Sequence, residues 1–207
     1  MCSKGFLVVI SGPSGGGKGT VVRRVREMMP EIGLSVSATT RPPRTGEEDG
    51  REYYFLDRDA FEEMVAREEM LEYTTYCGNY YGTLKREAQR ITASGQNLIL
   101  EIEVDGGGQV KRLYPDAVTI MLIPPNIGEM RARLLGRGTE SAETVERRLA
   151  RAAEEIQLAP DYDYVVVNET DGVEACAARI CEIIRAEGNR SGRMTDVIDA
   201  FLQTNDK

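Results

Sequence analysis

A glycine-rich segment at residues 12–20, Gly-Pro-Ser-Gly-Gly-Gly-Lys-Gly-Thr, has the residue types and spacing of a phosphate-binding loop. Glycines let backbone N–H groups converge on an anion where side chains would block its approach. Lys18 adds a charge that can reach the β- and γ-phosphates of a nucleoside triphosphate. A glycine-rich turn without a ligand is the weaker alternative. The residues expected to bind the triphosphate are Gly12, Pro13, Ser14, Gly15, Gly16, Gly17, Lys18, Gly19 and Thr20.

The elements around this loop fit that chemistry. Residues 6–10 are a run of strand formers, and residues 21–29 have the pattern of a helix, whose N-terminal dipole favours an anion. The Ser or Thr that usually follows the lysine and ligates Mg²⁺ is Gly19 here. Because the nearest hydroxyl is Thr20, we expect water and the nucleotide itself to hold most of the metal.

Composition limits the class of protein. A chain of 207 residues fits one domain, and a net charge of -8 argues against a general nucleic-acid surface. No apolar run approaches the ~20 residues that span a bilayer, and the N-terminus has no signal peptide pattern. The four cysteines lack metal-ligand spacing, so reduced thiols of a cytoplasmic protein are expected.

The chain contains no histidine, which excludes an imidazole base and a histidine metal site. Phosphoryl transfer to an acceptor that is itself a phosphate needs no base, because that nucleophile is already anionic. Such a reaction needs positioning and positive charge instead. Arginine-rich segments are therefore expected.

Two segments could bind an anionic acceptor. Arg41 and Arg44 lie in a proline- and glycine-rich loop whose stiffness would let them grip one phosphate, although a loop of solvated charges is favoured when the segment is taken alone. Residues 72–83 are dense in tyrosine, glycine and hydroxyls. A β-hairpin with packed aromatic rings explains this second segment as well as a binding role does.

Four segments in a fixed order, residues 12–20, 37–47, 78–83 and 136–140, make the chain resemble the guanylate kinases, which transfer the γ-phosphate of ATP to GMP. The resemblance runs from about residue 5 to about residue 187. It implies an α/β fold with a three-layer P-loop NTPase core built on a parallel sheet, an inserted GMP-binding lobe and a helical lid. Within a single domain of residues 1–207, the implied parts are the core at 5–36, 91–126 and 156–187, the lobe at about 37–90, the lid at about 127–155 and a tail at 188–207.

The resemblance also implies a GMP site. Its GMP-phosphate ligands would be Arg41, Arg44, Tyr53 and Tyr81, with Glu47 and Glu101 also on the GMP side. Glu72 would accept the guanine N1 and N2 protons, beside the hydroxyls of Ser37 and Thr83 near O6. Guanine offers two donors on this edge, whereas adenine would leave the Glu72 carboxylate unpaired, which predicts selection of guanine.

On the ATP side, the resemblance implies Arg133, Arg137 and Arg148 as contacts of the ATP phosphates and Asn168 as a residue near adenine. The implied catalytic set is Lys18, Arg41, Arg137 and Arg148. Thr20 and Glu103 are the expected Mg²⁺ contacts, through water. Arg147 and Arg151 are expected on a solvated helix face.

Residues 97–105 are predicted to form a buried strand that ends in acids, with Asp105 as a turn residue before three glycines. The runs at 118–123 and 164–168 are predicted to be strands buried in a parallel sheet. In the tail, residues 194–202 have helical spacing. Packing on the chain's own core is the plainer expectation for this tail, and a homodimer contact is the alternative.

Two other functions compete with an ATP:GMP phosphotransferase: a non-catalytic guanylate-kinase-like binding module, and a kinase for a different small acceptor. An intact phosphate loop argues against the first, and Glu72 with its neighbouring hydroxyls argues against the second. The 2′-deoxy nucleotide dGMP is expected to fit as well as GMP, because none of the site residues tests the 2′-hydroxyl.

Overall fold

The computed structural model describes residues 4–76, 78–136 and 142–203. Its centre is a parallel sheet of five strands in the order β2-β7-β1-β8-β9. Strand β1 lies in the middle, with Val8 in register with Ile99 on one side and with Val118 on the other. The strands are β1 (Leu7–Ser11), β2 (Gly33–Leu34), β7 (Leu98–Glu101), β8 (Val118–Ile123) and β9 (Tyr164–Val167).

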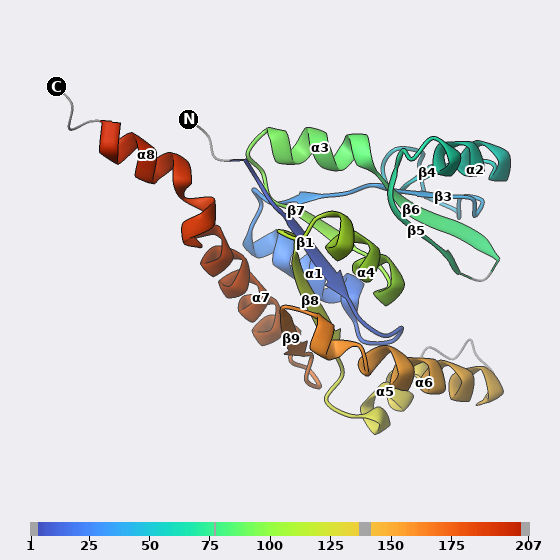
Figure 1. Ribbon diagram of the computed structural model, residues 1–207. Helices are drawn as coiled ribbons and strands as arrows, with labels where there is room; N and C mark the ends of the chain where they lie inside the picture. The colour runs from blue at the N-terminus through green and yellow to red at the C-terminus, as the bar shows by residue number, and fades with distance from the viewer. Residues whose placement is uncertain (1–3, 77, 137–141, 204–207) are drawn as a thin grey trace.

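Helices cover both faces of this sheet (Figure 1). On one face, α1 (Lys18–Met28) and α7 (Val173–Gly188) pack their apolar residues against alternate residues of β1, β7 and β8. On the other face, α3 (Lys85–Ala93) and α4 (Val104–Leu113) cover the remaining residues of β1 and β7. Parallel strands buried on both faces require this arrangement. The predicted fold class, an α/β protein with a parallel sheet in a three-layer core, is confirmed.

A second sheet of four strands, in the order β4-β3-β6-β5, lies beside the first and carries α2 (Arg58–Ala66). Phe61 of α2 is fully buried against Ala38, Met70 and Leu84 of this sheet, so the unit has an apolar core of its own. The strands are β3 (Ser37–Thr39), β4 (Tyr53–Phe55), β5 (Met70–Tyr76) and β6 (Asn79–Leu84). Strands β5 and β6 form an antiparallel pair, so the β-hairpin, one of the two interpretations of residues 72–83, is present.

A helix pair follows β8 (Figure 1). Helices α5 (Ile127–Leu135) and α6 (Ala142–Ile156) pack through Met130, Leu134, Val145 and Leu149. Asn126 caps α5 by accepting a hydrogen bond from the Glu129 N–H at 2.9 Å. A short 3₁₀ turn, η1 (Ala159–Asp161), then leads to β9.

The region after β7 differs from the prediction. The strand ends at Glu101, Glu103 is the N-cap of α4, and Asp105 lies in the first turn of that helix. The three glycines at 106–108 are helical although glycine is a poor helix former. The predictions of a strand through residue 105 and of a turn at Asp105 are therefore wrong, because contacts made by the helix outweigh local propensity.

Two other predictions also fail in part. Strand β9 forms, but it is the edge of the sheet, so Val165 and Val167 are exposed instead of buried. The tail forms η2 (Ser191–Arg193) and α8 (Thr195–Gln203), which extends away from the sheet in Figure 1. Phe201 is 71% exposed, so α8 does not pack on the core as expected, and contact with a second subunit stays a prediction. No helix within the described ranges is both long and apolar enough to cross a membrane.

Candidate active site

The glycine-rich loop joins the end of β1 to the start of α1, as its sequence predicts. Its lysine folds back over the loop: Lys18 Nζ donates to the Gly12 carbonyl at 2.5 Å and lies 3.3 Å from Glu103 Oε2. The Gly16 N–H donates to the Pro13 carbonyl at 3.0 Å, which closes a turn within the loop. The structure thus brings the lysine and an acid of α4's N-cap together at one end of the sheet.

Asn168, directly after β9, stabilises this loop by a hydrogen bond to its backbone. Its side chain is only 3% exposed and donates through Nδ2 to the Gly16 carbonyl at 2.9 Å. Gly17 has a φ of 90°, and a Cβ at this position would lie 2.5 Å from Asn168 Nδ2. Glycine at 17 is therefore required both by the backbone and by the asparagine. This contact gives Asn168 a structural role beside the proposed contact with adenine.

Two arginines of the helix pair reach the same loop. Arg133 of α5 donates through Nη2 to the Asn168 carbonyl at 2.8 Å and through Nη1 to the Gly16 carbonyl at 3.5 Å. Arg148 of α6 donates to the hydroxyl of Ser14. Both guanidinium groups therefore lie where a triphosphate on the loop would meet them. Arg137, the third expected lid arginine, lies outside the described residues.

The metal candidates lie beside the loop. Thr20 is exposed in the first turn of α1, and the carboxylate of Glu103 is near Lys18. A Cβ on Gly19 would lie 3.3 Å from Glu101 Oε1, so glycine at this position leaves room for that carboxylate. Within the described residues, no three Asp, Glu, Cys or His side chains gather in a metal-binding group.

Part of the set expected to bind the acceptor lines a cavity of about 320 Å³ between the two sheets, whereas Arg41, Arg44, Glu47 and Thr83 are not in its lining. Because the parallel strands end here, the cavity lies at the carboxyl edge of the central sheet, where open α/β folds bind ligands. Expected residues in its lining are Lys18, Ser37, Tyr53, Glu72, Tyr81, Glu101 and Glu103.

Glu72 is the most unusual of these residues, because a carboxylate that is 3% exposed lies between β5 and α4. Thr83 Oγ1 donates to its Oε1 at 2.8 Å. Burial raises the pKa of Glu72 to about 7, and the hydrogen bonds from Thr83 oppose this rise. A carboxylate in this state has unmet capacity for hydrogen-bond donors, and a ligand can supply them.

Arg41 lies beside Tyr53, a residue of the cavity's lining. Its Nη2 contacts Glu47 Oε1 at 2.9 Å, its Nη1 donates to the Pro42 carbonyl at 2.7 Å, and its guanidinium lies over the Tyr53 ring. Glu47 also accepts the Arg44 backbone N–H at 2.7 Å, which together with Arg41 lowers the pKa of Glu47. Glu47 therefore orients Arg41, while the Arg44 side chain is exposed.

A second cavity of about 370 Å³ lies between α6 and the residues Ser14, Tyr76 and Glu103. Arg147 and Arg151, which were expected on a solvated helix face, line it with Arg148. Arg151 also forms an i,i+4 ion pair, at 2.8 Å from Glu155. Tyr76 lines both cavities, and it was missed because nothing in a hairpin's sequence shows what its tip will face.

Comparisons with known proteins agree on one family. A sequence model of guanylate kinase matches residues 4–187. The guanylate kinase of Lactococcus lactis is 50% identical over 95% of each chain, and one from Thermus thermophilus is 46% identical over 97% of this chain and 90% of its own. The crystal structure of guanylate kinase from Anaplasma phagocytophilum, 33% identical, superposes with a TM-score of 0.74 over 92% of this chain and 90% of that one. A shikimate kinase, 14% identical with a TM-score of 0.50 over 90% of this chain and 96% of its own, shares the fold.

Proposed function

The chain belongs to the guanylate kinase family, whose reaction is the transfer of the γ-phosphate of ATP to GMP, and we propose that the two cavities divide this reaction between them. The acceptor occupies the cavity beside Glu72, and the donor's phosphates lie on the glycine-rich loop. The observation that carries this proposal is the buried Glu72 carboxylate, which accepts a hydrogen bond from Thr83 and lines a cavity that Lys18 also lines.

The acceptor base is recognised by charge and hydrogen bonding. The N1–H and N2–H groups of guanine would donate to the Glu72 carboxylate, with the hydroxyls of Ser37 and Thr83 near O6. Adenine lacks those donors and would leave a buried carboxylate unpaired, which weakens its binding. The same groups do not touch the 2′ position, so dGMP is proposed as a second acceptor.

The acceptor phosphate lies toward Arg41, Arg44, Tyr53 and Tyr81. Glu47 supports this role because it fixes the Arg41 guanidinium beside the Tyr53 ring. A planar guanidinium can give two parallel N–H bonds to a phosphate, which fixes orientation as well as charge.

The donor phosphates are bound by the loop at 12–20, by Lys18 and by the arginines of α5 and α6. Arg133 and Arg148 already contact the loop, and Arg137 is proposed to join them. Because the acceptor phosphate is anionic, the step needs alignment and charge neutralisation and no general base. A closed lid would also limit transfer to water, because it would exclude solvent from the reacting phosphates.

Mg²⁺ fits the chemistry of the side chains present. Magnesium typically uses one or two protein oxygen ligands and takes the rest from phosphates and water. Glu103 and Thr20 supply a carboxylate and a hydroxyl beside the loop, and we propose that they hold the ion through water. The ion would neutralise charge on the donor phosphates.

Cys176 and Cys181 are free and buried, which supports a reducing compartment, and we propose a cytoplasmic location.

The experiment that tests this function is ADP release from ATP and Mg²⁺ with GMP, dGMP, AMP, UMP or CMP as acceptor. Fast release with GMP and dGMP, with little for AMP, is expected. Release that is equally fast with AMP would refute the proposal that Glu72 selects guanine over adenine. Binding of GMP without any release would make the chain a binding module.

A further inference from the structure

Two of the three glycines of α4, Gly106 and Gly107, lie against residues of the site, although neither has a side chain to offer. Gly106 is buried in the first turn of the helix, beside Glu72. A Cβ on Gly106 would lie 2.6 Å from Glu72 Oε2 and 3.3 Å from its Cδ. Real Cβ atoms essentially never approach another heavy atom to within 3.0 Å. The position of the Glu72 carboxylate therefore depends on the missing side chain at 106.

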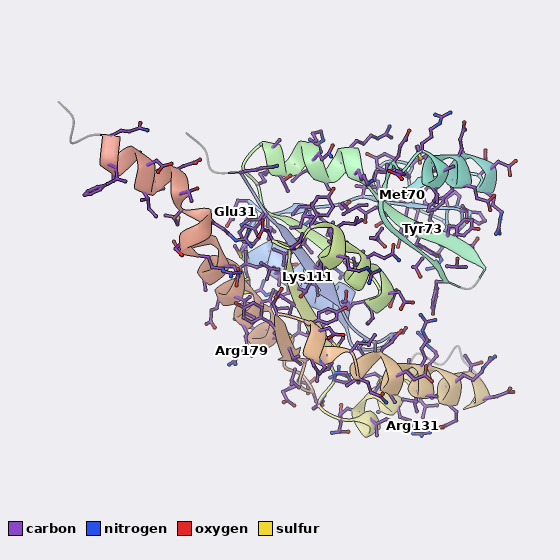
Figure 2. All side chains as sticks on the ribbon, in the orientation of Figure 1. Glu31, Met70, Tyr73, Lys111, Arg131 and Arg179 are labelled. Carbon is purple, nitrogen blue, oxygen red and sulfur yellow. The ribbon has the colours of Figure 1, made fainter. Side chains whose placement is uncertain are left out.

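Helix α4 cannot withdraw from this contact without losing others. One turn after Gly106, Gln109 bonds both backbone groups of Tyr73: its Oε1 accepts from the N–H at 3.3 Å, and its Nε2 donates to the carbonyl at 3.0 Å. Tyr73, labelled in Figure 2, is the neighbour of Glu72 on β5, so these bonds fix the helix to the strand that carries the carboxylate.

The adjacent glycine fixes the helix on its other side. A Cβ on Gly107 would lie 2.7 Å from both Ser11 Oγ and Tyr162 Oη. Ser11 ends β1 directly before the phosphate loop. Helix α4 thus lies between the acceptor cavity and the loop, so close to Glu72 on one side and to Ser11 and Tyr162 on the other that residues 106 and 107 have no room for a side chain.

We propose that Gly106 is a positioning residue that sets the specificity of the acceptor site, because it keeps the Glu72 carboxylate both bonded to Thr83 and directed at the acceptor base. The inference rests on the proposed reading of guanine by Glu72. Of the clashing groups, the Glu72 carboxylate is the end of a flexible side chain, whereas α4 is fixed by Gln109. A Gly106→Ala variant therefore folds and moves the carboxylate.

The size of the effect follows from the distance. The carboxylate has to move by about 0.8 Å to reach the 3.4 Å at which ordinary contact begins. A misplacement of ~1 Å in a binding group can cost roughly 100-fold in rate. For Gly106→Ala we expect kcat/KM with GMP to fall by about 10- to 100-fold and selectivity over AMP to fall with it, while the KM for ATP stays within about twofold.

Gly108→Ala is the matched control in the same helix. Its Cβ would meet only Arg112 Nη1, at 3.5 Å, which is ordinary contact. Both substitutions raise helix propensity equally. Gly108→Ala should therefore keep the GMP kinetics of the wild type, and equal losses in both variants would overturn the proposal.

A double-mutant cycle with Glu72→Ala tests whether Gly106 acts through the carboxylate. With Glu72 removed, Gly106→Ala should change kcat/KM with GMP by less than about twofold. If Gly106→Ala alone fails to fold, Glu72→Ala should restore folding, because it removes the clashing oxygen. A full additional loss in the Glu72→Ala background, or failure to restore folding, overturns the proposal. Unchanged GMP selectivity in Glu72→Ala itself would refute guanine reading instead, which separates the two failures.

Discussion

Replacement of Glu72 by Gln should make the free protein more stable and the enzyme less selective. Gln keeps the shape of the side chain and can still accept the Thr83 hydroxyl, but it cannot ionise. In the native protein burial raises the pKa of Glu72 from 4.5 to about 7. The native state thus holds a proton that the unfolded chain has released across this range, so the free energy of unfolding falls as pH rises from about 4.5 to about 7.

The size of this effect follows from the shift. At ~1.4 kcal/mol for each pKa unit, a rise from 4.5 to about 7 costs about 3 kcal/mol once Glu72 is ionised. Glu72→Gln removes this cost. The free energy of unfolding of the variant should therefore exceed that of the wild type by up to about 3 kcal/mol at pH 8, which corresponds to roughly 6 to 12 °C in Tm. Near pH 4.5 the two proteins should be almost equally stable.

The assay is thermal unfolding of both proteins without nucleotide, from pH 5 to pH 8. All other titrating groups are shared, so the difference between the two Tm curves isolates Glu72. The same preparations are then assayed with GMP and AMP. Loss of a charged acceptor for two guanine donors should reduce the preference for GMP by at least about tenfold.

A Tm difference that does not grow with pH would refute the reasoning, because the predicted penalty exists only when the carboxylate ionises. A variant that is less stable than the wild type at pH 8 would mean that Glu72 makes native contacts worth more than its desolvation. Unchanged selectivity with the expected rise in Tm would separate burial of Glu72 from recognition of guanine.

Three further substitutions test the other proposed roles. Lys18→Ala should lower kcat by roughly 1000-fold or more, because Lys18 binds the donor phosphates. The Kd for GMP, measured by calorimetry, should change little. Loss of GMP binding as well would contradict the assignment of Lys18 to the donor alone. Arg41→Lys keeps the charge but loses the planar guanidinium that contacts Glu47. The KM for GMP should therefore rise by about tenfold, with the KM for ATP unchanged. A KM for GMP within twofold of wild type would argue against phosphate binding by Arg41. Thr83→Val removes the 2.8 Å hydrogen bond to Glu72, so the free energy of unfolding at pH 8 should fall by about 1 to 3 kcal/mol, as measured by thermal unfolding. An unchanged Tm would be inconsistent with that bond.

The parts of the site that depend on local sequence could be predicted. The phosphate loop needs a strand, glycines and a helix in direct succession, and all three are adjacent in the chain. The order of the strands and helices follows from alternating patterns in the same way. The resemblance placed Glu72 and Thr83 together beside the acceptor base, and in the structure the Thr83 hydroxyl donates to the Glu72 carboxylate at 2.8 Å.

Features that depend on tertiary contacts could not be predicted. Three glycines after Asp105 indicate a turn by propensity, but α4 continues through them. Only the tertiary structure shows why glycine is needed there, since Gly106 and Gly107 face atoms that leave no room for a Cβ. An apolar run such as β9 predicts a strand, and only the strand order shows that it lies at the edge. The spacing of the tail predicts a helix without showing what its apolar face contacts.

Tyr76 forms part of the wall of both cavities, at the end of β5. The chain contains no tryptophan. A Tyr76→Trp protein would therefore carry a single indole at the boundary between the two nucleotides, and its fluorescence would respond to each of them. Titration with one nucleotide in the presence of the other would then give the order of binding and the coupling between the sites from one optical signal, without turnover.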